Sequence, residues 1–139
     1  MIVEYHGLSE TYLAKHLQAL TNSGILESEP GPRGGYRLTR PPEQITLLDV
    51  VETIDGREPL FRCTEIRQQG PAALAPQAYR LPCAIHVAMA QDDKAWRDAL
   101  HSQTIADIIN QYTQHASPQY QQQSKQWVVE HMRQARLEP

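Results

Sequence analysis

One stretch, residues 8–40, restricts the fold more than any other part of the chain, because a capped helix is followed there at once by a tight hairpin. Ser9 is a good N-cap, since its hydroxyl can accept a hydrogen bond from a free amide of the first helical turn. The apolar residues after it repeat at helical spacing and form one stripe: Leu13, Leu17 and Leu20. Gly24 is suited to end the helix, and the prolines and glycines of residues 30–35 force a turn before a returning strand at residues 36–38. This order predicts a winged helix-turn-helix.

The helix and the hairpin have the chemistry of a DNA-binding surface. The helix would lie in a major groove with its N-terminal residues at the base edges, and the hairpin, or wing, would follow the backbone or the minor groove. Hydroxyl and cationic side chains suit phosphate and base-edge contacts. The candidate DNA-binding residues are Ser9, Thr11, Tyr12 and Lys15 on the helix, and Arg33 and Arg37 on the wing. An ordinary amphipathic helix with a hairpin is the alternative that the pattern leaves open.

Both cysteines lie at the edges of residues 57–82, a segment with no sustained periodicity. A loop of this length in a compact chain is usually functional or disordered, and the position of Cys63 and Cys83 favours function. The sequence has no CxxC pair, which excludes the zinc-ribbon and thioredoxin patterns. Three alternatives remain open from the residues: buried thiols, a reversible disulfide, or a zinc site formed by Cys63, Cys83 and His86.

The chain resembles the Rrf family of bacterial winged-helix regulators, the IscR and NsrR group. The segments that carry this resemblance are YLAK, GGYRL and LLDVVETIDG, in that order and spacing, and it extends over residues 4–110. The RsrR type is the most similar, because the segments CTEIRQ and PCAIHVAMAQ also match. The resemblance implies a transcription regulator that binds double-stranded DNA as a homodimer.

The resemblance also implies a [2Fe–2S] cluster at the dimer interface. In the RsrR type, two cysteines come from one subunit, and a histidine and a glutamate come from the other. Cys63 and Cys83 match the cysteines and His6 matches the histidine, whereas the glutamate position precedes this sequence. A cluster held by three cysteines of one chain, as in many sensors of the family, is excluded because the chain has only two. Nitrogen ligands raise the potential of such a cluster, so we expect a redox-responsive regulator.

The chain begins later than the family pattern does. Residues 1–7 are expected to be the end of a helix, and the family carries a further helix before this point. We expect either a start placed too far downstream or a shortened N-terminus. A chain of this kind that dimerises without binding DNA is a further alternative.

The predicted fold is mainly α with a small β-hairpin wing and a long dimerisation helix. We assign residues 1–56 to the winged helix-turn-helix, whose first helix is missing here. The remaining regions are a cluster or sensor loop at 57–82, dimerisation helices at 83–115 and a C-terminal tail helix at 116–139. The pairs Thr46 and Asp49, and Thr104 and Asp107, predict capped helix starts, the first with an imperfect capping box because Asp replaces Glu.

Composition limits the function further. The net charge of −3 and the pI of about 6.0 do not indicate a bulk electrostatic attraction to nucleic acid, although Arg33, Arg37 and Arg40 cluster without an acid among them. No membrane-spanning run or signal peptide is evident, so we expect a cytoplasmic protein. The chain has no nucleophile elbow, no HExxH motif and no glycine-rich phosphate loop, so we expect no enzyme. A redox-responsive repressor is the expectation, with a cofactor-free or disulfide-switched regulator as the alternative.

Overall fold

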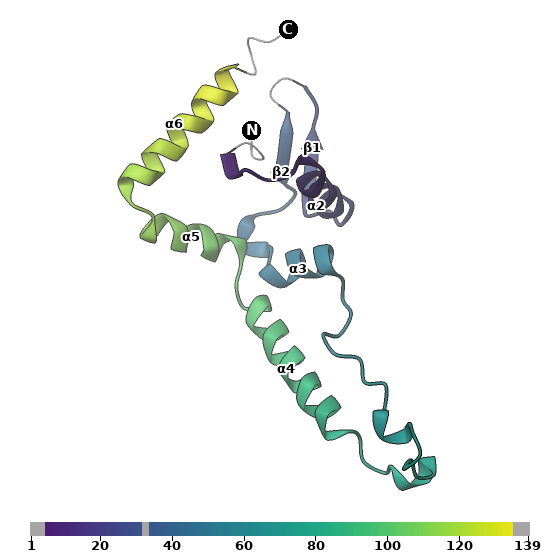
Figure 1. Cartoon of the computed structure of the whole chain (residues 1–139). Helices are drawn as coiled ribbons and strands as arrows, with labels where there is room; N and C mark the ends of the chain where they lie inside the picture. The colour runs from purple at the N-terminus through teal and green to yellow at the C-terminus, as the bar shows by residue number, and fades with distance from the viewer. Residues whose placement is uncertain (1–4, 32–33, 135–139) are drawn as a thin grey trace.

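The computed structural model describes residues 5–31 and 34–134 (Figure 1). This part of the chain is mainly helical. The elements are α2 (Glu10–Asn22), β1 (Leu26–Glu29), β2 (Gly35–Leu38), α3 (Leu47–Asp55), α4 (Ala84–His101), α5 (Ile105–His115) and α6 (Pro118–Gln134). Three short 3₁₀ turns, at Pro42–Gln44, Ile66–Gln68 and Pro76–Ala78, lie in the connections. The predicted fold class is therefore confirmed.

The helix predicted after Ser9 is α2. The Ser9 hydroxyl accepts a hydrogen bond from the Tyr12 amide, and the helix ends before Gly24, whose φ of +75° lies in the left-handed region. The leucine stripe of α2, predicted to need a partner, is half-buried and contains no fully buried residue. α2 packs on α3 and on β1.

The wing is the antiparallel pair of β1 and β2, with Leu26 opposite Leu38 and Glu27 opposite Arg37. At its tip the chain needs glycine for a steric reason. A Cβ atom on Gly34 would lie 2.1 Å from the carbonyl oxygen of Glu29, a distance that no side chain can adopt. At its base, the Thr39 amide donates to the Ile25 carbonyl at 3.1 Å.

The N-termini of α3 and α5 are joined by a short antiparallel bridge between Thr46 and Thr104. Each threonine caps its own helix, and each forms a complete capping box with the aspartate three residues later. The box at Thr46 is complete although Asp replaces Glu, so the expected imperfection is absent. Beside the bridge, Ile45 is fully buried, and its carbonyl accepts a hydrogen bond from the Ile105 amide at 2.9 Å.

α4 leads away from the winged helix, and residues 57–82 run beside it to the far end of the molecule (Figure 1). This loop contains two 3₁₀ turns and neither an α-helix nor a strand. On the other side, α5 and α6 form an arm that turns back toward the N-terminus, where the ring of Tyr5 lies 4.8 Å from that of Trp127. Within the described residues, no helix is long and apolar enough to cross a membrane.

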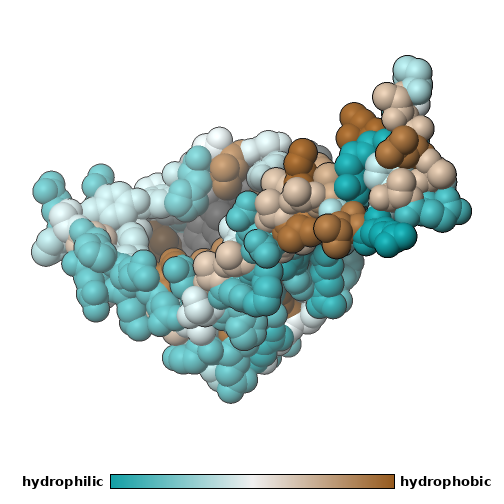
Figure 2. All heavy atoms as spheres, turned by 90° about the horizontal axis from the view of Figure 1, so that it is seen from below, coloured by the Kyte–Doolittle hydropathy of each residue, from teal (hydrophilic) through white to brown (hydrophobic). Residues whose placement is uncertain are grey.

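The chain exposes an unusually large surface. Its accessible area is 11004 Å², whereas a compact monomer of 15.8 kDa exposes roughly 7,300 Å². Among the described residues, only Ile25, Ile45 and Cys83 form a buried apolar core. Figure 2, which looks onto the end of the molecule, shows apolar side chains gathered toward its right side. The exposed large apolar residues of the loop and of early α4 are Leu60, Ile66, Leu74, Leu81, Ile85 and Val87.

Replacing Ile45 with alanine should lower the free energy of unfolding by about 2–5 kcal/mol, because the side chain is fully buried at the junction of α3 and α5. Urea unfolding at one fixed protein concentration measures this change. Ile54→Ala is the matched control, since it removes the same atoms from a side chain on α3 that is 37% exposed and lies outside the cysteine loop. It should lower the free energy of unfolding by about 1 kcal/mol or less. Equal losses in the two variants would contradict the assigned core.

Candidate nucleic-acid interface and cysteine site

The predicted DNA-binding residues of α2 lie at its N-terminal end and face solvent. Ser9 is the N-cap, and Thr11, Tyr12 and Lys15 are all exposed, Tyr12 by 60%. The Tyr12 ring meets the ring of His16 edge-on, with 4.3 Å between the ring centroids. This contact fixes the direction of an exposed aromatic side chain at the end of the helix that would approach base edges.

The wing holds its cationic side chain between two acids. Arg37 Nε lies 2.9 Å from Oε1 of Glu27 and 2.7 Å from Oε1 of Glu29, both on the opposite strand. The Arg37 side chain is 62% exposed, so these pairs are weak and a phosphate can replace them. Arg33, the other predicted wing contact, lies outside the described residues. The arginine cluster expected without acids is therefore partly neutralised in three dimensions, because strand pairing brings Glu27 and Glu29 to Arg37.

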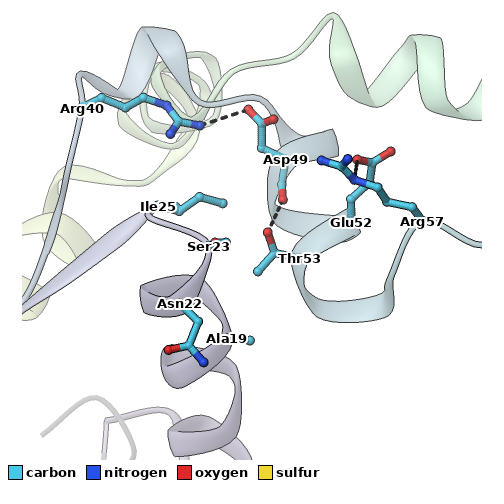
Figure 3. A pocket seen from close by; sticks show the side chains of 9 residues that line it. All are labelled: Ala19, Asn22, Ser23, Ile25, Arg40, Asp49, Glu52, Thr53 and Arg57. Atoms are coloured by element: carbon cyan, nitrogen blue, oxygen red, sulfur yellow. Dashed lines mark hydrogen bonds and ion pairs between the residues drawn. The ribbon is translucent and has the colours of Figure 1, made fainter.

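A polar cavity of about 610 Å³ lies between the end of α2, the start of β1, and α3 (Figure 3). Two ion pairs belong to its lining. Arg40 Nη2 lies 3.6 Å from Oδ2 of Asp49, and Arg57 Nε lies 2.9 Å from Oε2 of Glu52. Hydrogen bonding to the Thr46 backbone, with smaller help from the Thr46 hydroxyl and Arg40, lowers the pKa of Asp49. The two ion pairs connect α3 to the segment before it, through Arg40, and to the segment after it, through Arg57.

The two cysteines are brought to the same end of the molecule. Cys83 is the buried N-cap of α4, and Cys63 lies half-buried in the loop, where its Sγ accepts a hydrogen bond from the Glu65 amide at 3.4 Å. The backbone amides of His86 and Ile85, in the first turn of α4, lower the pKa of the Cys83 thiol, and the charge of Arg67 adds to this effect. Cys83 is therefore a thiol whose environment favours the thiolate.

Arg67 holds the cysteine loop together, although it is not among the predicted site residues. Its guanidinium bonds both carboxylate oxygens of Glu65, at 2.5 and 2.9 Å, and donates to the Leu81 carbonyl at 3.2 Å. It also lies over the ring of Tyr79, 5.3 Å from the centroid. The pKa of Arg67 is raised chiefly by Glu65, with contributions from both cysteine side chains. The only sequence signal was the position of Arg67 four residues after Cys63.

His6, the third predicted cluster ligand, does not lie near the cysteines of the same chain. It precedes α2 at the N-terminal side of the molecule, and α4 begins at the opposite end (Figure 1). Its ring packs edge-on against Tyr5, with 4.8 Å between the centroids.

The zinc alternative of Cys63, Cys83 and His86 stays a prediction. Across residues 5–31 and 34–134, no three His, Cys, Asp or Glu side chains are placed to hold a metal ion. Cys83 is the N-cap and faces the backbone amides of α4, and His86 instead lies near Glu65, where its charge helps to lower the pKa of that carboxyl.

Comparison with known proteins identifies related regulators. Residues 1–111 match the Rrf2 family, described as an iron-dependent transcriptional regulator. NsrR of Shouchella clausii, an HTH-type transcriptional regulator, is 29% identical over 78% of this chain and 68% of its own length. Protein aau3 of Rhizobium meliloti is 32% identical over 78% of this chain and 66% of its own length.

Solved structures agree with this assignment. CymR of B. subtilis, titled a global cysteine regulator, is 25% identical with a TM-score of 0.56, covering 77% of this chain and 72% of that one. The chain spans just under two thirds of the length of the curated relatives it matches first, 62% and 66% for two of them.

The thiol of Cys83 should ionise at a lower pH than a free cysteine, whose pKa is about 8.5, because amides of the α4 N-terminus stabilise the thiolate. Ultraviolet thiolate absorbance of the reduced, cluster-free Cys63→Ser protein measures this. Arg67→Met should move the titration to higher pH, since a positive charge beside the thiolate is lost. Arg62→Met is the control, because Arg62 pairs with Glu58 on the surface. Identical titrations in all three proteins would refute the role of Arg67.

Proposed function

The chain belongs to the Rrf2 family of transcriptional regulators, and we propose that it binds operator DNA as a homodimer whose affinity is set at Cys63 and Cys83. One observation carries this proposal. Both cysteines lie together at the end of the molecule opposite to the wing, in a loop fixed by Arg67, while the helix and wing present exposed polar and cationic side chains. A sensing end and a DNA-binding end are thus separate parts of one chain. Such a regulator acts in the cytoplasm.

The large exposed surface supports a homodimer. The area beyond that of a compact monomer is roughly 3,700 Å² per chain, whereas obligate dimers commonly bury roughly 1,000–2,500 Å² per partner, so an interface of that size would account for part of the excess. Much of the apolar surface surrounds the cysteine loop and the first turns of α4. A second copy that covers this surface would shield the half-buried Cys63 from water, as the chain itself already shields Cys83.

We propose that the cysteine site holds a [2Fe–2S] cluster. Each chain supplies two sulfur ligands, and the environment of Cys83 favours the thiolate form that binds iron. The donor set of one chain therefore fits half of a four-ligand site, and His6 of a second copy is our candidate for the third ligand. A bound cluster supplies one-electron redox chemistry. The protein residues hold it, shield it with the apolar surface and set the local charge through Arg67.

A thiol switch without a cofactor is the second candidate. It is favoured by the placement of both thiols beside one guanidinium, because a nearby cation stabilises the thiolate that attacks in disulfide formation. The 20-residue separation of Cys63 and Cys83 would then close a loop when two thiols lose two electrons and two protons to a cellular disulfide.

Anaerobic purification followed by absorption spectroscopy and iron and sulfide analysis separates the two candidates. A brown protein with about two irons per site, and colourless Cys63→Ala and Cys83→Ala variants, would support the cluster. His6→Ala should keep iron but change the spectrum or the reduction potential. A parent protein that stays colourless after cluster reconstitution would exclude the cluster and leave the thiol switch.

Arg37→Ala should weaken binding to a duplex selected by the parent from a random-sequence pool, and should reduce the slope of log affinity against log salt by about one. Glu27→Gln with Glu29→Gln should strengthen binding, because the arginine is released from its two acids and like charges are removed from the wing. Fluorescence anisotropy at several salt concentrations measures both effects. Lys125→Ala on α6 is the control. Unchanged affinity in the wing variants would exclude Arg37 from the DNA contact.

A further inference from the structure

Arg97 on α4 joins three segments that lie far apart in the sequence. Its Nη1 lies 2.9 Å from Oε1 of Glu52 on α3, and its Nε lies 2.9 Å from Oδ2 of Asp93, one turn earlier on α4. Its Nη2 donates to the Glu58 carbonyl oxygen at 2.9 Å. Because a guanidinium is a rigid planar fork, these bonds fix α3, α4 and the first residues of the loop relative to one another.

The same network reaches further toward Cys63. Oδ1 of Asp93 accepts a hydrogen bond from the Leu60 amide at 3.3 Å, three residues before Cys63. Glu58 and Leu60 are thus both bonded to the pair of Asp93 and Arg97. The loop that carries the cysteine is attached to α4 at this point, and a change in its path must move this pair or break its bonds.

The same network also contacts α3, the helix on which α2 packs. Glu52 also pairs with Arg57 Nε at 2.9 Å, and both side chains line the cavity between α2 and α3 (Figure 3). α2 is the helix that carries the predicted base-edge contacts. A shift of Glu52 therefore acts directly at the surface on which α2 rests.

The environment of Arg97 distinguishes it from ordinary surface charges. Its side chain is 20% exposed and that of Asp93 is 15% exposed. Lys94 and Asp98, on the same helix at the same spacing, form a pair whose side chains are 76% and 65% exposed. Exposed pairs of this kind contribute little, whereas a partly buried network with several hydrogen bonds is screened less by water and salt. The pKa of Asp93 is lowered, chiefly by its hydrogen bond with Arg97.

We propose that Arg97 is the positioning residue that transmits the state of the cysteine loop to the winged helix. This inference rests on the proposed function. The state of the cysteine site sets the path of residues 58–63, the bonds of Arg97 and Asp93 carry that path to Glu52, and α3 changes its position beneath α2. A purely structural residue would stabilise the fold equally in every state of the cysteine site. Removal of a transmitting residue, by contrast, reduces the effect that the cysteine site has on DNA affinity.

A double-mutant cycle tests the proposal. DNA affinity is measured for the parent, Cys63→Ala, Arg97→Met and the double variant, using the duplex selected from a random-sequence pool by the parent. Cys63→Ala should change the affinity of the parent by about tenfold, a usual size for coupling between distant sites. In the Arg97→Met background the same substitution should change affinity by less than about twofold. An undiminished effect of Cys63→Ala in that background overturns the proposal.

Two further variants keep the cycle informative. Lys94→Met is the matched control, because it removes a cation from the same helix, and Cys63→Ala should keep its full effect there. Glu52→Gln keeps the shape of the side chain but removes its charge and one of its two acceptor oxygens. It replaces Arg97→Met in the cycle if Arg97→Met fails to fold. Glu52→Gln should reduce the effect of Cys63→Ala as Arg97→Met does. Loss of coupling in Lys94→Met as well would overturn the specific role of Arg97.

Hydrogen exchange separates failure of this proposal from failure of the proposed function. If Cys63→Ala leaves the DNA affinity of the parent unchanged, the cysteine site does not regulate DNA binding. Exchange of the α3 amides, residues 47–55, then decides the role of Arg97. If Cys63→Ala changes the exchange of the α3 amides in the parent but not in the Arg97→Met background, the transmitting role of Arg97 is supported. If Cys63→Ala leaves the exchange of the α3 amides unchanged in the parent, that role is overturned.

Discussion

The pairing of Thr46 with Thr104 beside the buried side chain of Ile45 is the contact on which the arrangement of the helices depends. It joins the starts of α3 and α5, two helices whose first turns are each completed by a capping box. The amides of Leu47 and Ile105 are bonded across the junction, and those of Asp49 and Asp107 are bonded by the capping threonines. These bonds satisfy orphan donors of both first turns, so the two helix ends can meet beside the buried Ile45. α2 and the wing then rest on α3, and α4 leaves from the same junction.

The junction of Thr46, Thr104 and Ile45 is too small to stabilise the whole extended chain by itself. The described residues bury few apolar side chains, and many large ones remain in water along the loop and the helices. Burial of apolar surface is the main favourable term in folding, so the proposed homodimer would gain stability by covering part of this exposed apolar area. Part of the exposed apolar surface lies at the same end of the molecule as the two cysteines, so a partner that covers it would also lie beside the cysteine site.

The features that the sequence predicted are those determined by neighbours along the chain. The N-cap at Ser9, the stop at Gly24 and the two capping boxes each depend on residues within one helical turn, and each is present. The Arg97 network was not predictable, because Glu52 lies 45 positions away and no local pattern connects the two. The partners of Arg37 were missed for the same reason, since strand register, and not sequence distance, brings Glu27 opposite it. The role of His6 stays a prediction.

The cysteine loop and α2 lie at different ends of the molecule (Figure 1), so regulation of DNA binding by the cysteines requires a structural change that passes between them. The cysteines lie beyond α4, and the residues proposed to meet base edges lie on α2, so a change at a thiol cannot reach DNA by direct contact. Within a chain, Asp93 and Arg97 connect the Leu60 amide, three residues before Cys63, with Glu52 on α3. Between chains, His6 directly precedes α2, so binding of His6 by the cysteine site of a second copy would act on the same helix from its other end. In the proposed mechanism the first route acts on α2 through α3 and the second through His6, so a change of cluster or thiol state would alter the orientation of this helix without unfolding it.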